Sequence, residues 1–266
     1  MGEDREVALG KVRLLWRRFY AGYERLLETL MGKGVKRNIL HPQWLARSAL
    51  GRALSRSARE ARGKLLDIGS GSAPYADLFR GKISAFIALD IESPEERLKF
   101  PFVLGDALHL PFKKGSFDTG LMTQVLEHTQ EPSAALAEAN RVLKSSGVLL
   151  ISVPFLYPIH DGCDYYRFTP QGITYLLEKA GFKTKEVIPQ GSYWTGAGTH
   201  FNMYLFWKVL AKNRPLVFAR ILLTPFLLLF FAAVNLFCLI ADALLPFVEE
   251  SSNFLLVAGK EGQPRG

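Results

Sequence analysis

The chain has 266 residues, of which 48% are hydrophobic and 22% are charged, and its formal net charge is +8. This length suits one large domain with additions or two small domains; the composition excludes a wholly disordered chain, and two cysteines exclude a disulfide framework. The positive charge is concentrated, because residues 1–62 hold 14 Lys and Arg against 6 Asp and Glu, whereas the remainder is neutral.

The N-terminal segment is predicted to form two basic helices. Apolar residues recur at helical spacing over residues 7–31 with arginines between them, and a second basic helical stretch runs from about residue 42 to residue 62. No apolar run follows the first basic residues, so the pattern is not that of a secretory signal. We expect residues 1–62 to be a basic helical arm, or a cap over a ligand site in the rest of the chain.

From residue 63 onward, strand-like and helical patterns alternate. Two helical stretches begin at Pro132 and Pro170, where first-turn prolines belong, and residues 190–199 have the glycines and aromatic residues of a loop. The alternation predicts an α/β fold with a mostly parallel, doubly wound, Rossmann-like sheet. The predicted strands are residues 65–68, 85–89, 102–104, 119–123, 148–153, 185–189 and 253–259, and the predicted helices are 75–79, 133–143 and 170–180.

A glycine turn between the first predicted strand and the following helix indicates a nucleotide-type site. Gly69, Ser70 and Gly71 would present backbone N–H groups and a helix N-terminus to a ligand. A dinucleotide fingerprint would require a small residue at position 74, which is Pro74. Asp67, at the end of the strand, would repel a pyrophosphate but attract an ammonium group. The pattern therefore favours S-adenosylmethionine (SAM) over NAD or FAD.

Two further carboxylates follow the next two predicted strands. Asp90 can accept hydrogen bonds from both hydroxyls of a ribose, and Asp106 can accept one from an adenine amino group. A single aspartate at such a position is more often a solvated loop residue or a helix cap than a ligand contact. Because three carboxylates follow three successive strands, the ligand-binding interpretation is favoured.

These segments resemble the class I SAM-dependent methyltransferases, most closely the broad subgroup acting on small molecules, lipids and quinone precursors. The resemblance covers about residues 64–189 and 253–259 and implies seven strands, the last antiparallel, with SAM over the strand carboxyl ends. Ala73 departs from the usual third loop glycine. The matching motifs are residues 67–71, 90, 105–107, 110–112, 116–118, 124–128 and 141–149. The expected cofactor contacts are Asp67, Gly69, Ser70, Gly71, Asp90, Ile91, Asp106, Ala107 and Gln124.

The acceptor side is predicted to contain two histidines. His128 and His160 each follow a strand at the functional edge and are candidates for a general base; the alternatives are a hydrogen-bonded structural histidine and a surface loop residue. The loop after His160 resembles one found in part of the family, with Asp164, Tyr165 and Arg167 as expected acceptor contacts. Arg167 would either pair with Asp164 or hold an anionic acceptor. These residues are too crowded for a known metal pattern, so no metal site is predicted.

An uncharged run of 21 residues, 221–241, is long enough to span a bilayer. A single span conflicts with a final core strand in residues 249–266, because the chain must return to the side it left. Pro225, Asn235 and Pro246 are natural break points for such a return. We therefore expect residues 201–248 to be an inserted apolar helical hairpin or helix pair in one leaflet, monotopic rather than spanning. Alternatively, these helices cover the sheet or form a dimer interface.

Together these features predict a SAM-dependent methyltransferase with a core at residues 63–200, acting at the cytoplasmic face of a membrane. The expected acceptor is an amphipathic small molecule such as a lipid, a quinone precursor or a lipid-linked sugar. The basic arm would meet anionic lipids. Two alternatives remain, an RNA or protein methyltransferase that uses the arm for its substrate, and a non-catalytic SAM-fold scaffold or sensor. Nucleic acid ranks lower, because it does not explain the apolar run.

Overall fold

The structure is a computed structural model. It describes every residue except 1–20, 33–36, 161, 211–216 and 262–266. The predicted first basic helix therefore lies largely outside the described residues, although residues 21–31 are helical. The second is helix α2, Trp44–Ser57.

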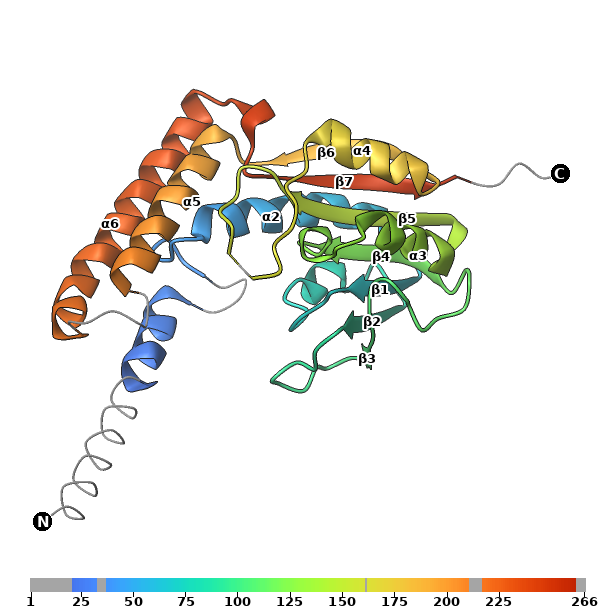
Figure 1. Ribbon diagram of the computed structural model, residues 1–266, viewed down its shortest axis with the longest axis horizontal. Coiled ribbons are helices and arrows are strands. Elements are labelled where there is room, and N and C mark those ends of the chain that lie inside the picture. Colours follow the sequence, from blue (N-terminus) through green and yellow to red (C-terminus); the bar gives the residue numbers. More distant parts are fainter. Residues whose placement is uncertain (1–20, 33–36, 161, 211–216, 262–266) are drawn as a thin grey trace, which may run out of the picture.

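The core is a seven-stranded sheet in the order β3-β2-β1-β4-β5-β7-β6 (Figure 1). Strands β1 to β5 are parallel, whereas β7 lies between β5 and β6 and is antiparallel to both. This confirms the predicted mixed sheet with an antiparallel last strand. The strands are β1 Lys64–Ile68, β2 Ala85–Asp90, β3 Phe102–Leu104, β4 Phe117–Thr123, β5 Leu143–Pro154, β6 Phe182–Gln190 and β7 Asn253–Lys260.

Helices α3 (Pro132–Val142) and α4 (Pro170–Lys179) pack against one face of the sheet. Both begin at the predicted prolines, and Thr169 caps α4 by accepting from the Gly172 amide at 3.1 Å. The predicted helix after β1 is reduced to a single 3-10 turn. Such turns are Ala58–Glu60, Ala76–Phe79, Leu126–His128 and Val248–Glu250.

Helix α2 covers the opposite face of the sheet. Leu50 and Leu54 pack in one buried cluster with strand residues that include Leu65, Leu121 and Leu150. Burying a leucine side chain stabilises a fold by about 1.5–3 kcal/mol. The C-terminal half of residues 1–62 thus packs against the sheet as part of the core.

A helix pair is inserted between the last two strands. It consists of α5 (Tyr193–Leu205), a π-helical turn (Phe206–Leu210) and α6 (Val217–Leu244). Figure 1 shows α5 and α6 side by side beyond one edge of the sheet. The insertion closes at its base, because Gln190 at the end of β6 pairs with Asn253 at the start of β7.

The prediction of a loop at residues 190–199 is wrong, because most of these residues belong to α5. The predicted end of the core, residue 200, lies inside the same helix. The glycines of α5 allow the helix to pack closely against segments that are far away in the sequence. A Cβ atom on Gly198 would lie 2.5 Å from the Cys238 sulfur, and one on Gly196 would lie 3.3 Å from Leu156.

The breaks expected at Pro225 and Asn235 are also wrong, since α6 is continuous through both. Pro225 removes one backbone hydrogen bond from the helix. The buried face of α6, which includes Phe231, still packs against the rest of the protein, so the helix continues. The chain reverses instead between α5 and α6, and α6 ends just before Pro246.

Substituting Gly198 tests the helix-pair packing. Gly198→Ala should lower the free energy of unfolding by about 1–3 kcal/mol, because the added methyl group overlaps Cys238. Gly51→Ala is the control, since this α2 glycine has open space around it and alanine favours helix by up to about 1 kcal/mol. Chemical denaturation measures both, and equal stability of the two variants would contradict the close approach.

Candidate active site

The loop after β1 is held in a conformation that requires glycine. The amides of Gly69 and Ser70 donate to the Leu89 carbonyl at 2.8 and 3.0 Å. Gly69 has a φ of +68°, and a Cβ atom there would lie 2.4 Å from Val125. Gly71, with a φ of +52°, faces open space. The loop therefore leaves its backbone accessible to a ligand.

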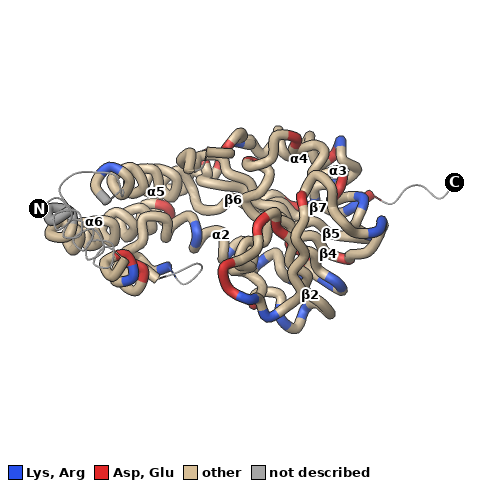
Figure 2. The backbone as a smooth tube through the Cα atoms, turned by 60° about the horizontal axis from the view of Figure 1, so that its bottom comes forward, with Lys and Arg blue, Asp and Glu red and all other residues tan. Residues whose placement is uncertain are grey.

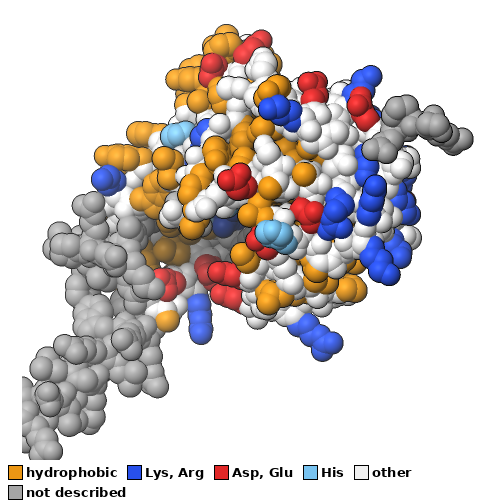
Figure 3. Space-filling view, turned by 45° about the vertical axis from the view of Figure 1, so that its right-hand side comes forward, with side chains coloured by type: hydrophobic (Ala, Val, Ile, Leu, Met, Phe, Trp, Pro, Cys, Tyr) orange, Lys and Arg blue, Asp and Glu red, His pale blue; other side chains and the backbone are white. Residues whose placement is uncertain are grey.

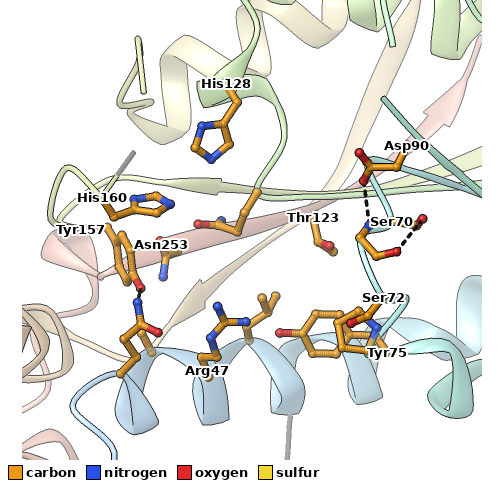
Figure 4. A pocket seen from close by; sticks show the side chains of 17 residues that line it. Arg47, Ser70, Ser72, Tyr75, Asp90, Thr123, His128, Tyr157, His160 and Asn253 are labelled. Carbon is orange, nitrogen blue, oxygen red and sulfur yellow. Dashed lines mark hydrogen bonds between the residues drawn. The ribbon is translucent and has the colours of Figure 1, made fainter. Parts of the chain in front are cut away.

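Two acidic side chains flank this loop. Asp90 accepts a hydrogen bond from the Gly71 amide at 2.7 Å (Figure 4). Asp67 is 3% exposed, and its Oδ1 atom has no hydrogen-bond partner. Burial, and then the charge of Asp90, raise the pKa of Asp67 well above its usual value. A buried carboxyl group without a partner is suited to receive a cationic group from a ligand.

Two cavities meet at the loop. One, of about 340 Å³, extends toward α2, and the other, of about 410 Å³, extends toward β2 and β3. Both are lined by Gly69, Asp90, Gln124 and His128. Side chains from strand ends and from α2 therefore converge on one space, as Figure 4 shows for the first cavity.

The second cavity contains the predicted adenine-side residues. Ile91, Asp106 and Ala107 line it together with Asp90. Asp106 accepts from the Leu108 amide through Oδ1 at 2.9 Å, so one of its oxygens holds the local turn. The predicted cofactor contacts are thus brought together around the two cavities, except that Asp67 lies buried beneath them.

Comparison with known proteins agrees with this geometry. Residues 66–151 match a family model described as a methyltransferase domain. A demethylmenaquinone methyltransferase of Paenarthrobacter aurescens is 34% identical over 102 residues, 36% of this chain and 40% of that protein. An uncharacterised protein of Methanocaldococcus jannaschii is 34% identical over 101 residues, 38% of this chain and 48% of that protein. The chain thus matches about half, or less, of the length of these relatives.

The fold agrees as well. A SAM-dependent methyltransferase from Thermotoga maritima has a TM-score of 0.50 at 18% identity, covering 92% of this chain and 97% of the other. Residues 66–151 thus match a methyltransferase domain, and the chain has the fold of the class I SAM-dependent methyltransferases.

The residues of this domain fit SAM. The buried Asp67 carboxyl group suits the ammonium group, and Asp90 suits the ribose. Arg47 of α2 lines the first cavity and offers a cation for the cofactor's carboxylate. Ala73 has a φ of 48°, in the left-handed region, which explains why glycine is usual at this position and how alanine replaces it at modest cost.

His128 and His160 lie together, with ring centroids 5.3 Å apart. His128 Nδ1 lies 3.0 Å from the Cys163 carbonyl, and His160 Nδ1 lies 3.2 Å from the Pro158 carbonyl. A carbonyl only accepts, so each Nδ1 carries the proton and each Nε2 keeps a lone pair when the ring is neutral. Both histidines line the first cavity (Figure 4), where a lone pair can accept a proton.

The predicted acceptor-binding residues divide into two groups. The Asp164 side chain is buried and pairs with Arg167 through two hydrogen bonds, one of them 2.7 Å between Oδ2 and Nη2. Neither side chain lines the two cavities, so of the two roles considered for Arg167 the structure shows the internal ion pair. Tyr165 lines the second cavity, and its hydroxyl accepts from the Gln130 amide at 3.0 Å.

Sequence reasoning missed a group of residues on the first cavity. Arg47 projects from α2, and Tyr75, Tyr157 and Asn253 surround the same space (Figure 4). No local pattern singles them out, because they become neighbours only when α2 packs across the sheet and β7 returns beside β5. Tyr75 and Asn253 are almost fully buried, and Asn253 Oδ1 has no hydrogen-bond partner.

Glu127 is a second unassigned group. Its side chain is fully buried, neither carboxyl oxygen has a hydrogen-bond partner, and Oε1 lies 3.9 Å from His128 Nε2. Burial raises the pKa of Glu127 to about 8. The carboxyl group is therefore mostly protonated at neutral pH, next to a histidine of the cavity.

Removing the Asp90 carboxylate tests the ribose assignment. Asp90→Ala should weaken binding of S-adenosylhomocysteine, the demethylated cofactor, by about 10- to 100-fold, as expected for loss of hydrogen bonds to a charged group. Isothermal titration calorimetry measures the affinity. Asp77→Ala removes a carboxylate from an exposed site and serves as the control. Unchanged affinity of a folded Asp90→Ala protein would contradict the assignment.

Glu127 should make stability depend on pH. Its pKa is raised from 4.5 to about 8 on folding, so between these values the folded state holds a proton that the unfolded state has lost. Stability therefore falls as pH rises through this window, by up to about 1.4 kcal/mol per pH unit. Glu127→Gln lacks this loss, and its stability relative to the wild type should increase from pH 5 to pH 8.

Chemical denaturation at several pH values measures this difference. Glu178→Gln, on the exposed face of α4, is the matched control and should follow the wild type at every pH. Parallel stability profiles for Glu127→Gln and the wild type would show that Glu127 is not protonated in the folded state.

Proposed function

We propose that this protein transfers the methyl group of SAM to an amphipathic acceptor at the cytoplasmic face of a membrane. The observation that carries the proposal is the place of the apolar helix pair. It leaves the sheet after Gln190 and rejoins it at Asn253, at the edge where the cofactor cavities open, and Asn253 lines the first cavity. The apolar surface of the helix pair, which is suited to contact lipid, therefore lies next to the proposed active site.

The outer face of α6 is apolar and unpacked. The segment Ile221–Leu244 has a mean hydropathy of 2.4, but only 28% of its most apolar part is buried. Leu222, Phe226 and Leu229 are each about two-thirds exposed or more and share one face of the helix. Figure 2 shows few charges along α6, and Figure 3 shows apolar side chains gathered at this end of the molecule. Contiguous apolar surface of this kind marks a lipid or protein contact.

The inner face of α6 is fastened to the protein. Asp242 accepts hydrogen bonds from the hydroxyls of Ser192 and Thr195, and Asn235 bonds to Asn202 at 3.0 Å. A helix with one packed face, whose chain returns to the sheet edge it left, fits attachment within one leaflet better than a single crossing. Trp207 and Tyr204, exposed near the end of α5, suit the interfacial region.

The cavity residues support methyl transfer. SAM supplies an electrophilic methyl group, and the chain's own residues bind the acceptor and receive its proton. We assign the proton acceptor to the Nε2 atom of His128 or His160. The name of the Paenarthrobacter aurescens relative specifies a quinone-type acceptor, which agrees with an amphipathic acceptor here. A lipid or a lipid-linked sugar agrees equally.

Methyl-labelled SAM tests the reaction. Incubation of the protein with labelled SAM and a total membrane lipid extract should move label into the organic phase. Parallel incubations with RNA and with a protein mixture should stay unlabelled. Label in either of these and none in lipid, by a protein that binds SAM, would overturn the proposed acceptor class.

Charges placed on the outer face of α6 should abolish membrane binding. Replacing both Phe226 and Leu229 by Glu removes apolar side chains worth about 1.5–3 kcal/mol each and adds two costly charges. We expect at least a tenfold loss of flotation with vesicles containing phosphatidylglycerol, while cofactor affinity is unchanged. Tyr175→Glu, at an exposed site on α4, is the control. Equal flotation of all three proteins would contradict membrane attachment through α6.

A further inference from the structure

Each of the two histidines on the first cavity lies beside a carboxyl group. The His160 Nδ1 atom lies 3.2 Å from Asp164 Oδ2. The His128 Nε2 atom lies 3.9 Å from Glu127 Oε1. The side chains of both acidic residues are 0% exposed. The ionisation of each carboxyl group therefore decides whether its histidine is supported as a base.

The Asp164 carboxyl group is held in its charged form. Its two oxygens accept from the Arg167 guanidinium, and Oδ2 also accepts from the His160 backbone amide at 3.2 Å. The hydrogen bond from Arg167 contributes most to lowering the pKa of Asp164. An ionised carboxylate beside Nδ1 holds a histidine in one tautomer and stabilises the imidazolium that forms when Nε2 takes a proton.

The Glu127 carboxyl group is held in its neutral form. Neither of its oxygens has a hydrogen-bond partner, and burial, followed by the charge of Asp164, raises its pKa to about 8. A neutral carboxyl group beside His128 brings no charge that would stabilise an imidazolium there. Two neighbouring carboxyl groups whose ionisation differs in this way give their histidines different roles.

The His160 ring is also fixed by the loop around it. Its Nδ1 atom lies 3.2 Å from the Pro158 carbonyl, and Arg167 donates to the carbonyls of Tyr157 and Pro158 at 3.0 and 3.1 Å. The rings of His128 and Tyr157 pack edge-on against it, with centroids 5.3 and 5.4 Å away. Figure 4 shows these rings at the end of the first cavity away from the loop after β1. The space between is open to a methyl acceptor.

We propose that His160 is the catalytic base, that Asp164 and Arg167 position it, and that the methylated group of the acceptor is a hydroxyl. This inference rests on the proposed function and chooses between the two histidines considered there. A carboxylate is already ionised at neutral pH and needs no base, whereas a hydroxyl oxygen must lose its proton as it attacks. A base with its own orienting carboxylate therefore indicates a phenol or an alcohol as the methylated part of the amphiphile.

The proposed reaction balances at these atoms. The hydroxyl of the acceptor gives its proton to His160 Nε2, and its oxygen forms a bond to the methyl carbon. The bond between that carbon and sulfur breaks, and its electron pair stays on sulfur. The products are a methyl ether, S-adenosylhomocysteine and an imidazolium, which then returns its proton to water. Asp164 stays ionised throughout and offsets the charge of the imidazolium.

The chemistry of the product tests the methylated group. Wild-type protein is incubated with methyl-labelled SAM and a total membrane lipid extract, and the labelled lipid is divided. Mild alkali releases label from a carboxylic methyl ester, and hot hydriodic acid releases it from a methyl ether, whereas a methyl group on carbon resists both. We expect label that survives alkali and is released by the acid. Alkali-labile label, or label that resists both, would overturn the inference.

The pH profile of the same reaction tests the base. The wild-type initial rate should rise with pH to a plateau, as a histidine loses its proton. His160→Gln should be slower by about 100-fold or more at pH 7, and its rate should rise without a plateau as the acceptor ionises unaided. Asp164→Asn should be slower by about 10- to 100-fold and reach its plateau at lower pH, because the imidazolium loses its counter-charge. His200→Gln, at an exposed position of α5, is the control.

Other titrating groups are separated from His160 by a second background. Glu127 titrates in the same range, so the profiles are also measured with Glu127→Gln, in which the plateau should remain. His128→Gln should likewise keep the plateau, since the proposed base is intact. The charged and titratable groups around the His160 ring are Asp164, Arg167, His128, Glu127, Tyr157 and Arg47 of α2.

A further measurement does not depend on the methyl acceptor. Nitrogen NMR of the full chain with isotope-labelled histidine and bound S-adenosylhomocysteine distinguishes the two ring tautomers, and the His160 signals are those missing from His160→Gln. We expect neutral His160 to carry its proton on Nδ1, and Asp164→Asn to raise the share of the other tautomer. A proton on Nε2 in the wild type would overturn the inference whatever the lipid assay gives.

The variants are compared as folded proteins that bind S-adenosylhomocysteine. If Asp164→Asn does not bind it, the double variant with Arg167→Gln replaces it, because this leaves no partly buried charge unpaired. A wild-type pH profile in His160→Gln would overturn the assignment and leave lipid methylation, and so the proposed function, standing. Wild-type protein that binds the cofactor and labels no lipid would overturn the proposed function, and this inference with it.

Discussion

The antiparallel pairing of β7 between β5 and β6 constrains the rest of this molecule. Asn253 pairs with both Pro154 and Gln190, so the apolar insertion must return to the sheet edge from which it departs. A strand paired on both sides, with seven of its eight residues buried, is costly to withdraw from a sheet. The insertion is consequently a helical hairpin whose two ends meet at the sheet next to the first cavity. The outer face of its helix α6 is exposed.

A polar residue within the apolar helix α6 connects the insertion to the segment that precedes α2. A buried amide without partners would cost about 1–3 kcal/mol, so a fully buried asparagine in α6 must have a structural use. Asn235 bonds to the backbone on either side of Leu40, and this segment leads directly into Gln43 and α2. These hydrogen bonds join the helix pair and the α2 side of the cavity in one packed unit.

The sheet and the cofactor loop could be predicted because their signals are local. Asp67, Gly69 and Asp90 follow their strands directly, and parallel strands bring their carboxyl ends to one edge. The helix at Gly198 could not be predicted, since the need for glycine comes from Cys238, 40 positions away. Arg47 was equally hidden, because a basic helix on a membrane and a basic helix over a cavity have the same spacing.

The net charge of +8 consequently acts in two different settings. Arginines on the exposed side of α2, such as Arg52 and Arg56, face water, where salt screens attraction to a membrane over about 8 Å. Arg47 belongs to the same basic quarter of the chain but lines the first cavity, where partly buried charges are screened less than charges on the surface. A surface charge attracts any anionic partner, whereas a charge inside a cavity attracts only an anion that can enter it. The basic segment thus contributes both to the surface of the protein and to the lining of the first cavity.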